Sequence, residues 1–461
     1  MSFVSEFEAA PDFIPMLNIG AGFDIITGKY YKGKHGENIL SGGLAPMTGI
    51  AGGGNKFKST IMWYMMLSVL NRYKVAEGLA YDTEISLSMG RLYQLAQYMD
   101  AIGGVDLAGE NRLRLTNGVK YSGNKFFEVW SKIARHRAEN PKEFMLDSPF
   151  LESDGKFMRL FKPSVTGIDS LSNFTADAVS KMQKENELGD SGRNMEAMRS
   201  SLIKTQMLME LPNLTGSSGC YMMMSAHVGN QHQLDPYAPN AKRMQHLKQN
   251  LKFKNVPEKF EFLPNNCWHA ENAAVMERDK LPEFPRSPDD DLKGDTDLNL
   301  VSLRNLRGKN GMTGLPLEIV VSQTDGVLPE LTALKALKTA KFGLGGNDRN
   351  YFLDLLPEES LSRTTVRAKS RLLPKLQRAF EISHELSQIN DYWHDFDKSL
   401  FMAPDELYAK IKEKGYNWDE LLDTRGYWVF NQDAPNQKPF LSTKDLLEMA
   451  TGQYRPYWLK K

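Results

Sequence analysis

A glycine-rich loop followed by a long apolar run constrains the fold of this chain more than any other feature. Residues 47–60 read Met-Thr-Gly-Ile-Ala-Gly-Gly-Gly-Asn-Lys-Phe-Lys-Ser-Thr, and an apolar run from Ile61 to Leu70 follows without a helix breaker. Since this run is longer than most strands, it predicts a buried helix. A loop that leads directly into a helix presents backbone N–H groups and the positive end of the helix dipole to an anion.

The loop matches the phosphate-binding pattern G-x-x-x-x-G-K-[ST] at Gly52, Lys58 and Ser59. In such a loop the lysine neutralises β- and γ-phosphate charge, and the hydroxyl holds Mg²⁺. Phe57 stands where the pattern has glycine, and its Cβ restricts φ. The match predicts an ATP and Mg²⁺ site, with a purely structural glycine-rich loop as the alternative. The predicted nucleotide-binding residues are Gly52, Gly53, Gly54, Asn55, Lys56, Phe57, Lys58, Ser59 and Thr60.

The remaining apolar segments predict an α/β fold with a mainly parallel sheet. Short apolar segments alternate with stretches of helical periodicity, a pattern typical of parallel strands joined by helices. The expected strands are Leu79–Tyr81, Val165–Ile168, Gly219–Ala226 and Leu315–Val321, and the expected helices cover 89–101 and 193–211.

Three of these strands end at residues with suitable chemistry. Glu84 follows the first strand, where a general base can orient an attacking water. Asp169 ends the second strand and is predicted to hold Mg²⁺ through its water shell, together with Ser59. His227 ends the third strand, a position from which it could sense a γ-phosphate. The alternative for each is an ordinary polar residue at a strand end.

The chain divides into three predicted parts. Residues 1–37 form an N-terminal segment whose Phe3, Phe7 and Phe13 pack either on a neighbouring subunit or on the chain's own core. Residues 38–345 form the core, with polar stretches at 228–268 and 282–297 expected as long loops. Residues 346–461 form a smaller, mostly helical C-terminal domain.

Composition narrows the class of protein. The 57 Lys and Arg residues balance 57 Asp and Glu residues, so whole-chain charge offers no argument for a nucleic-acid partner. Two cysteines cannot build a disulfide framework, which favours a reducing compartment such as the cytoplasm. No apolar run approaches the length of about 18–20 residues that a membrane span needs, and the N-terminus does not resemble a signal peptide. We therefore expect no membrane partner.

Four segments resemble the RecA family, most closely the phage UvsX-type recombinases. They are Ile14–Ile19 with the glycine-rich stretch after it, Lys56–Ser59, Tyr81–Glu84, and Asp169–Leu171 with Asn173. UvsX-type proteins also carry phenylalanine before the motif lysine. The resemblance covers about residues 12–345 and implies a RecA-like P-loop ATPase core with a mainly parallel sheet flanked by helices.

The resemblance also implies an activity and further site residues. It implies a DNA-dependent ATPase that polymerises as a helical filament on single-stranded DNA and catalyses homologous pairing and strand exchange with double-stranded DNA, in a phage-infected bacterial cell. Lys58, Glu84 and His227 would be catalytic, and Arg307 and Lys309 would reach the ATP of a neighbouring subunit. The chain departs from the family in a longer second loop without its glycine-rich stretch and in a glycine-rich segment after Arg307.

Two segments are predicted to bind DNA. The first loop, near 186–196, and the helix after it resemble the family's first DNA-binding loop. Within 228–268, residues 241–259 carry six basic residues against one glutamate, which suits phosphate neutralisation, although a solvated face is the plainer interpretation. The candidate contacts are Arg193, Met195, Arg199, Lys242, Arg243, Lys248, Lys252, Phe253 and Lys254.

Two other functions use the same motifs. A hexameric RecA-fold replicative helicase would share the phosphate loop and Glu84 but form closed rings. A non-hydrolysing RecA-like mediator would keep the fold as a scaffold, although Lys58, Ser59, Glu84 and Asp169 are all present. The role of residues 346–461 stays open between duplex capture by a basic stretch and simple helical packing. That stretch contains Arg363, Arg367, Lys369 and Arg371.

Overall fold

The computed structural model describes residues 13–177, 192–230, 244–248, 250–289, 292–309, 311–347, 349–392 and 396–459; for 192–197 it describes the backbone alone. The predicted contacts of Phe3 and Phe7 and most of the predicted first DNA loop therefore lie outside the described residues. Phe13 is described, and its ring stacks on Tyr31 with centroids 3.7 Å apart. That aromatic packs on its own chain.

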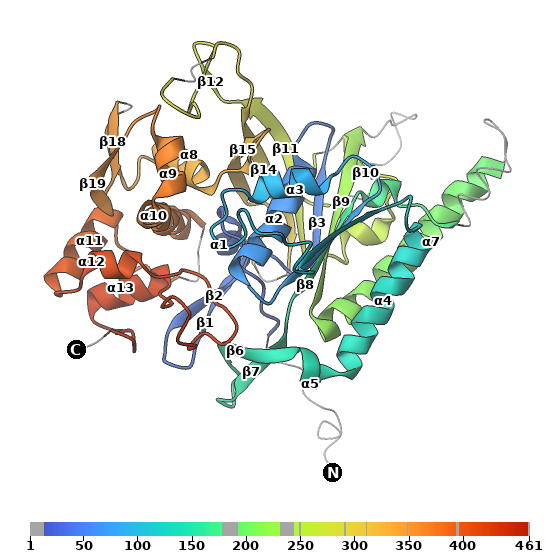
Figure 1. Ribbon diagram of the computed structural model, residues 1–461, viewed down its shortest axis with the longest axis horizontal. Helices are drawn as coiled ribbons and strands as arrows, with labels where there is room; N and C mark the ends of the chain where they lie inside the picture. Colours follow the sequence, from blue (N-terminus) through green and yellow to red (C-terminus); the bar gives the residue numbers. More distant parts are fainter. Residues whose placement is uncertain are drawn as a thin grey trace.

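A ten-stranded, mostly parallel sheet forms the centre of the described part of the chain (Figure 1). Its strands follow the order β16-β15-β14-β11-β3-β9-β8-β4-β5, and β10 pairs with β9. The strands from β11 to β5 in this order run parallel, whereas β14, β15, β16 and β10 are antiparallel additions. The bounds are β3 (Met47–Gly52), β4 (Glu77–Asp82), β5 (Leu113–Asn117), β8 (Ser164–Asp169), β9 (Cys220–Asn230), β10 (Leu251–Lys254), β11 (Asn266–Val275), β14 (Leu298–Gly308), β15 (Pro316–Ser322) and β16 (Gly326–Val327). The predicted α/β fold with a mainly parallel sheet is confirmed.

Helices cover both faces of this sheet. α2 (Lys58–Arg72) packs with α3 (Met89–Ala96) on one face, and α4 (Gly123–Glu139) packs with α7 (Gly192–Ser218) on the other. In β9, the Met223 side chain packs in the core under α2 and α3, whereas Met222 and Met224 pack in the core under α4 and α7. Because successive side chains of a strand point to opposite faces, a strand buried on both sides reads as a continuous apolar run.

The chain ends and the excursions from the sheet add short elements. On the N-terminal side these are α1 (Phe23–Thr27), β1 (Lys29–Lys32), β2 (Asn38–Ser41), α5 (Pro141–Phe144), β6 (Met145–Leu151), β7 (Phe157–Phe161) and the 3-10 helix η2 (Leu171–Asn173). Later come η3 (Glu258–Glu261), β12 (Glu277–Arg278), β13 (Leu281–Pro282), α8 (Pro329–Ala340), β17 (Leu344–Asn347), β18 (Asn350–Leu353), β19 (Leu356–Leu361), α9 (Val366–Leu372), α10 (Pro374–Tyr392), α11 (Pro404–Glu413), α12 (Trp418–Leu422) and α13 (Thr443–Thr451).

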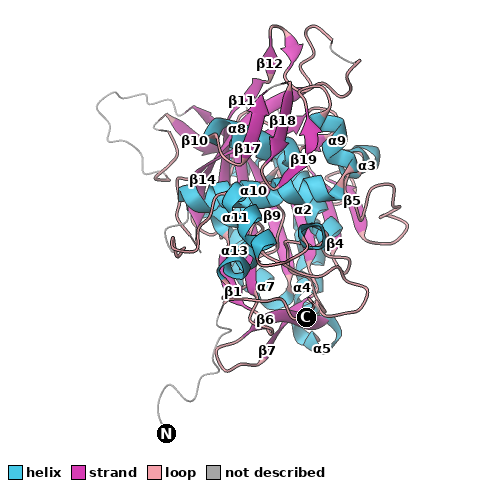
Figure 2. Cartoon of the chain, turned by 90° about the vertical axis from the view of Figure 1, so that its left-hand side faces the viewer, coloured by secondary structure: helices cyan, strands magenta, loops and turns pink. Residues whose placement is uncertain are grey.

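The predicted domain boundaries cut through secondary structure. The boundary after residue 37 falls inside the β1–β2 hairpin, and the boundary after residue 345 falls inside β17. Helices α8 to α13 gather on one side of the molecule, and Figure 2, viewed from that side, places α10, α11 and α13 in front. Their buried side chains share one core with Ile25 of α1 and Val320 of β15. The C-terminal helices therefore pack against α1 and β15 through this core, which is separate from the cores under α2 and α3 and under α4 and α7.

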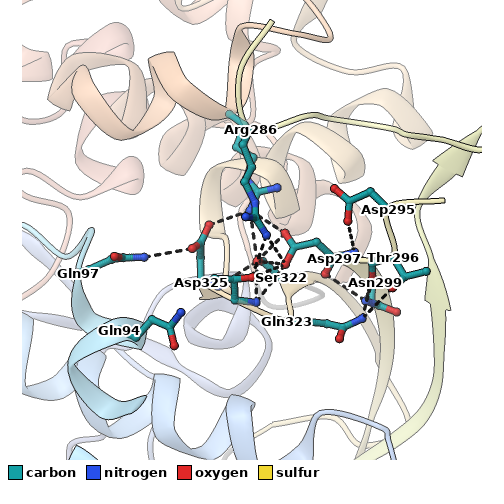
Figure 3. Close-up of polar contacts among 12 residues, drawn as sticks. Gln94, Gln97, Arg286, Asp295, Thr296, Asp297, Asn299, Ser322, Gln323 and Asp325 are labelled. Carbon is teal, nitrogen blue, oxygen red and sulfur yellow. Dashed lines mark hydrogen bonds and ion pairs between the residues drawn. The ribbon is translucent and has the colours of Figure 1, made fainter. Parts of the chain in front are cut away.

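A buried ion cluster fastens α9 to the sheet. The Arg367 guanidinium donates hydrogen bonds to Asp297 at 2.9 Å and to Asp325 at 2.7 Å, and Arg371 also pairs with Asp325. Figure 3 shows Asp297 and Asp325 converging from the sheet, with Arg286 reaching Asp297 from above. Arg367 is only 1% exposed. This geometry decides between the two interpretations of the basic stretch for Arg367: it packs the helix and presents no charge to DNA.

Among the described residues, no helix is long and apolar enough to cross a membrane.

Candidate nucleotide site

The predicted phosphate loop lies between the end of β3 and the start of α2. Phe57 is the N-cap of α2 and has φ 57°, so it adopts the left-handed conformation that the pattern's glycine would supply. For a residue with a Cβ this conformation costs about 1–2 kcal/mol. The ring is partly buried against the core beside α2, and this packing offsets the strain. Phenylalanine is therefore compatible with the turn.

The loop leaves room above its glycines. A Cβ added at Gly54 would meet no atom within 4 Å, and one at Gly53 would meet only Lys56, at 3.9 Å. Lys56 turns aside and donates a hydrogen bond from Nζ to Asn272 Oδ1 at 3.2 Å. Backbone without side chains beside a helix N-terminus suits the close approach of a phosphate.

Lys58, Ser59 and Asp169 meet at the first turn of α2. The Lys58 side chain is buried, and the Ser59 hydroxyl lies near enough to the Asp169 carboxylate to lower its pKa. Ser225 Oγ donates to Asp169 Oδ1 at 2.5 Å. Burial raises the pKa of Asp169 above its ordinary value, although hydrogen bonds from Ser225 and Ser59 work against that rise. A nearby cation stabilises the ionised form of a buried carboxylate, so the side-chain oxygens of Ser59 and Asp169 suit Mg²⁺.

Glu84 accepts three hydrogen bonds, all on Oε1. Ser170 Oγ donates at 3.1 Å and Asn173 Nδ2 at 3.2 Å, and His227 Nε2 lies 3.1 Å away. Burial favours the neutral acid, but the bonds from His227 and Ser170 and the charge of Lys58 outweigh burial and lower the pKa of Glu84. Glu84 is therefore ionised at neutral pH, as a base that orients water must be.

Asp82 holds the Glu84 turn, and sequence reasoning did not single it out. Its buried carboxylate accepts backbone N–H bonds from Glu84, Ile85, Ser86 and Leu87 at 2.6–3.0 Å. Aspartate readily accepts hydrogen bonds from the backbone that follows it, so the sequence Asp82-Thr83-Glu84 was sufficient to predict this turn. The turn fixes the direction of Glu84.

Arg307 and Lys309 lie away from this loop. Arg307 on β14 pairs with Cys267 of β11, which pairs with Gly49, whereas Gly52 at the loop pairs with Ala270. Along β11, the partner of Arg307 and the partner of Gly52 are three residues apart, which corresponds to about 10 Å. Arg307 Nε instead donates to the Pro264 carbonyl at 2.9 Å. These two residues are not part of the nucleotide site of their own chain, and their contact with a neighbour's ATP stays a prediction.

The predicted second DNA loop contains a strand. β10 pairs antiparallel with β9, which places Lys252 opposite Gly229 and Lys254 opposite His227. Both lysines are exposed, whereas Phe253 between them is buried and packs edge-on against Phe260 with centroids 5.4 Å apart. The prediction that Phe253 contacts DNA is therefore corrected, because strand alternation turns its ring into the core.

The other candidate DNA contacts differ in how much of each residue the structure describes. Lys248 and Arg199 are exposed, and Arg199 lies on α7. Arg193 and Met195 belong to the first turns of α7, but their side chains lie outside the described residues, as do Lys242 and Arg243 entirely.

Comparison with protein-family models and with curated proteins found no match for this chain. Within the part of the chain that the structure describes, no group of three or more His, Cys, Asp or Glu side chains is arranged to hold a metal ion.

Proposed function

We propose that this chain is an ATP-dependent DNA recombinase that polymerises on single-stranded DNA and catalyses homologous pairing and strand exchange. The observation that carries the proposal is the convergence of the 52–59 loop, Asp169, Glu84 and His227 at the carboxyl ends of adjacent parallel strands. Ligands of open α/β sheets bind at this edge. The sequence resemblance to RecA-family recombinases supplies the DNA chemistry.

In the proposed reaction each side chain has a separate task. Lys58 neutralises charge on the β- and γ-phosphates, and Ser59 and Asp169 hold Mg²⁺, which supplies further charge neutralisation. Glu84 orients the attacking water and accepts its proton. His227 contacts Glu84 and stands opposite Lys254 on β10, so it lies between the candidate base and an exposed cationic strand. Such a contact suits a sensor that reports the γ-phosphate to DNA-binding residues.

The same proposal implies a cellular compartment for the protein. Both cysteines, Cys220 and Cys267, are buried free thiols, which agrees with a reducing cytoplasm. The UvsX-type resemblance makes this the cytoplasm of a phage-infected bacterium.

Two experiments test the proposal. Electron microscopy with single-stranded DNA and a slowly hydrolysed ATP analogue, combined with a joint-molecule assay, should show open helical filaments and strand invasion. Closed rings with duplex unwinding would instead support a hexameric helicase. Glu84→Gln should bind ATP but hydrolyse it at least about a hundredfold more slowly. DNA binding by a wild-type protein that has no ATPase activity would support the scaffold function of a mediator.

A further inference from the structure

Lys204 is a buried lysine with an unusual set of partners. It lies on α7 and is 4% exposed. Its Nζ donates hydrogen bonds to two backbone carbonyls, Ser172 O at 3.0 Å and Asn255 O at 2.9 Å. Among the described residues no carboxylate pairs with it, and burial lowers the pKa of Lys204 to about 8. Burial of the ammonium group costs free energy, and the two bonds to carbonyls offset part of that cost.

The first carbonyl belongs to the segment that holds Glu84. Ser172 lies in η2, between Ser170 and Asn173, and both of these donate hydrogen bonds to Glu84 Oε1. The Ser172 hydroxyl donates to the Lys254 carbonyl at 2.9 Å and accepts the His227 N–H at 3.0 Å. η2 is therefore bonded at once to Glu84, β9, β10 and, through Lys204, α7.

The second carbonyl belongs to the end of β10. Asn255 follows Lys254 and has φ 56°, a left-handed conformation that asparagine tolerates. Lys204 thus joins two elements that carry exposed candidate DNA contacts: Arg199 lies on α7, and Lys252 and Lys254 lie on β10. Lys204 therefore bonds α7 both to η2 and to the end of β10.

We propose that Lys204 is a positioning residue that couples α7 and β10 to Glu84 through η2, so that DNA bound to these elements sets the geometry of the catalytic carboxylate. The inference rests on the proposed function, because it presupposes both DNA binding and ATP hydrolysis. A two-state element biased by one ligand and read by a second site is sufficient for such coupling.

Lys204→Met tests the coupling, because methionine preserves an unbranched apolar stem but removes the donors. ATP turnover is measured without DNA and with saturating oligothymidylate. We expect the ratio of DNA-stimulated to DNA-free turnover to fall about tenfold, with the KM for ATP changed less than about twofold. Lys204→Arg should recover part of the ratio, and Gln206→Ala, on an exposed position of the same helix, should leave it unchanged.

An unchanged ratio would overturn the coupling, and an unchanged ratio with both turnovers reduced would indicate a purely structural role. If Lys204→Met fails to fold, Ser172→Ala serves as the second variant, since it removes the hydroxyl bonds from η2 to β9 and β10. It should lower the same ratio, and an unchanged ratio counts equally against the coupling. A wild-type protein without ATP turnover would refute the proposed function itself, an outcome distinct from either result.

Discussion

The Asp297–Arg367 pair gives the sharpest stability prediction. Replacing Asp297 with asparagine preserves the side chain's size but removes its charge. The carboxylate accepts hydrogen bonds from Arg367 at 2.9 Å, from Ser322 at 2.8 Å and from Thr324 Oγ1 at 2.9 Å. The variant leaves the Arg367 guanidinium buried with Asp325 as its remaining acidic partner. α9 should then be held less tightly to the sheet.

The magnitude follows from the protonation equilibrium of the carboxyl group. Burial alone would raise the pKa of Asp297, but the hydrogen bonds from Arg367 and Ser322 outweigh burial and lower that pKa from 3.8 to about 2. This difference corresponds to about 2 kcal/mol of stability at neutral pH. Removing one partner of a buried pair typically costs about 3–5 kcal/mol. Because Asp325 still compensates Arg367, we expect the free energy of unfolding to fall by about 2–3 kcal/mol.

The pH dependence has a definite sign. The folded pKa of Asp297 lies below its unfolded value, so its stabilisation is complete above the unfolded pKa of 3.8 and is lost as pH falls toward about 2. Urea unfolding followed by fluorescence and circular dichroism should therefore show a gap between wild type and variant that is full at neutral pH and narrows below pH 3.8.

The matched control is Asp423→Asn, which breaks an exposed ion pair with Lys438. A surface pair of this kind contributes about 0–1 kcal/mol. If Asp297→Asn destabilises the protein no more than Asp423→Asn does, the buried cluster does not stabilise the attachment of α9 and the reasoning fails.

Three further predictions concern the site. Phe57→Gly should relieve backbone strain of about 1 kcal/mol and retain ATP binding, whereas Lys58→Ala should abolish ATP binding. If calorimetry shows that Phe57→Gly does not bind ATP, the left-handed conformation of Phe57 is not what the loop requires. Asp82→Ala should lower ATP turnover about tenfold or more by releasing the Glu84 turn, with little change in ATP affinity, and unchanged steady-state turnover would remove that role. Lys252→Ala should reduce the salt slope of DNA binding by about one, and an unchanged slope would remove that contact. Phe253→Leu should leave the affinity for DNA unchanged, and a loss of affinity at every salt concentration would reinstate Phe253 as a contact.

Local patterns predicted much of the fold. The apolar run from Ile61 to Leu70 lies within α2, and the strands expected before Glu84, Asp169 and His227 are β4, β8 and β9. These predictions succeed because each depends on a short stretch whose hydrophobicity and breakers are visible in the chain. Boundaries were less predictable: β10 and η3 lie within a stretch expected as a loop, because a polar segment can pair with a strand that is already in place.

In the candidate site, too, the features set by neighbouring residues were predictable and those set by the fold were not. The spacing of Gly52, Lys58 and Ser59 is local, and so is the approximate position of Glu84 at a strand end. The approach of His227 to Glu84 joins residues separated by 143 positions, and no periodicity specifies it. It depends on the sheet order, in which β9 and β8 stand between β3 and β4.

The sequence alone determined the loop, the helix behind it and the α/β class, because steric and hydrophobic preferences of neighbouring residues decide those features. Tertiary structure alone decided which of these side chains face solvent and which are buried. Arg367 is one of several basic residues in its stretch but is buried between two carboxylates. Phe253 is a predicted DNA contact, but its ring lies in the core, and Lys204 donates to two backbone carbonyls. Each outcome depends on partners distant in the chain, whose proximity only the packed sheet and its helices establish.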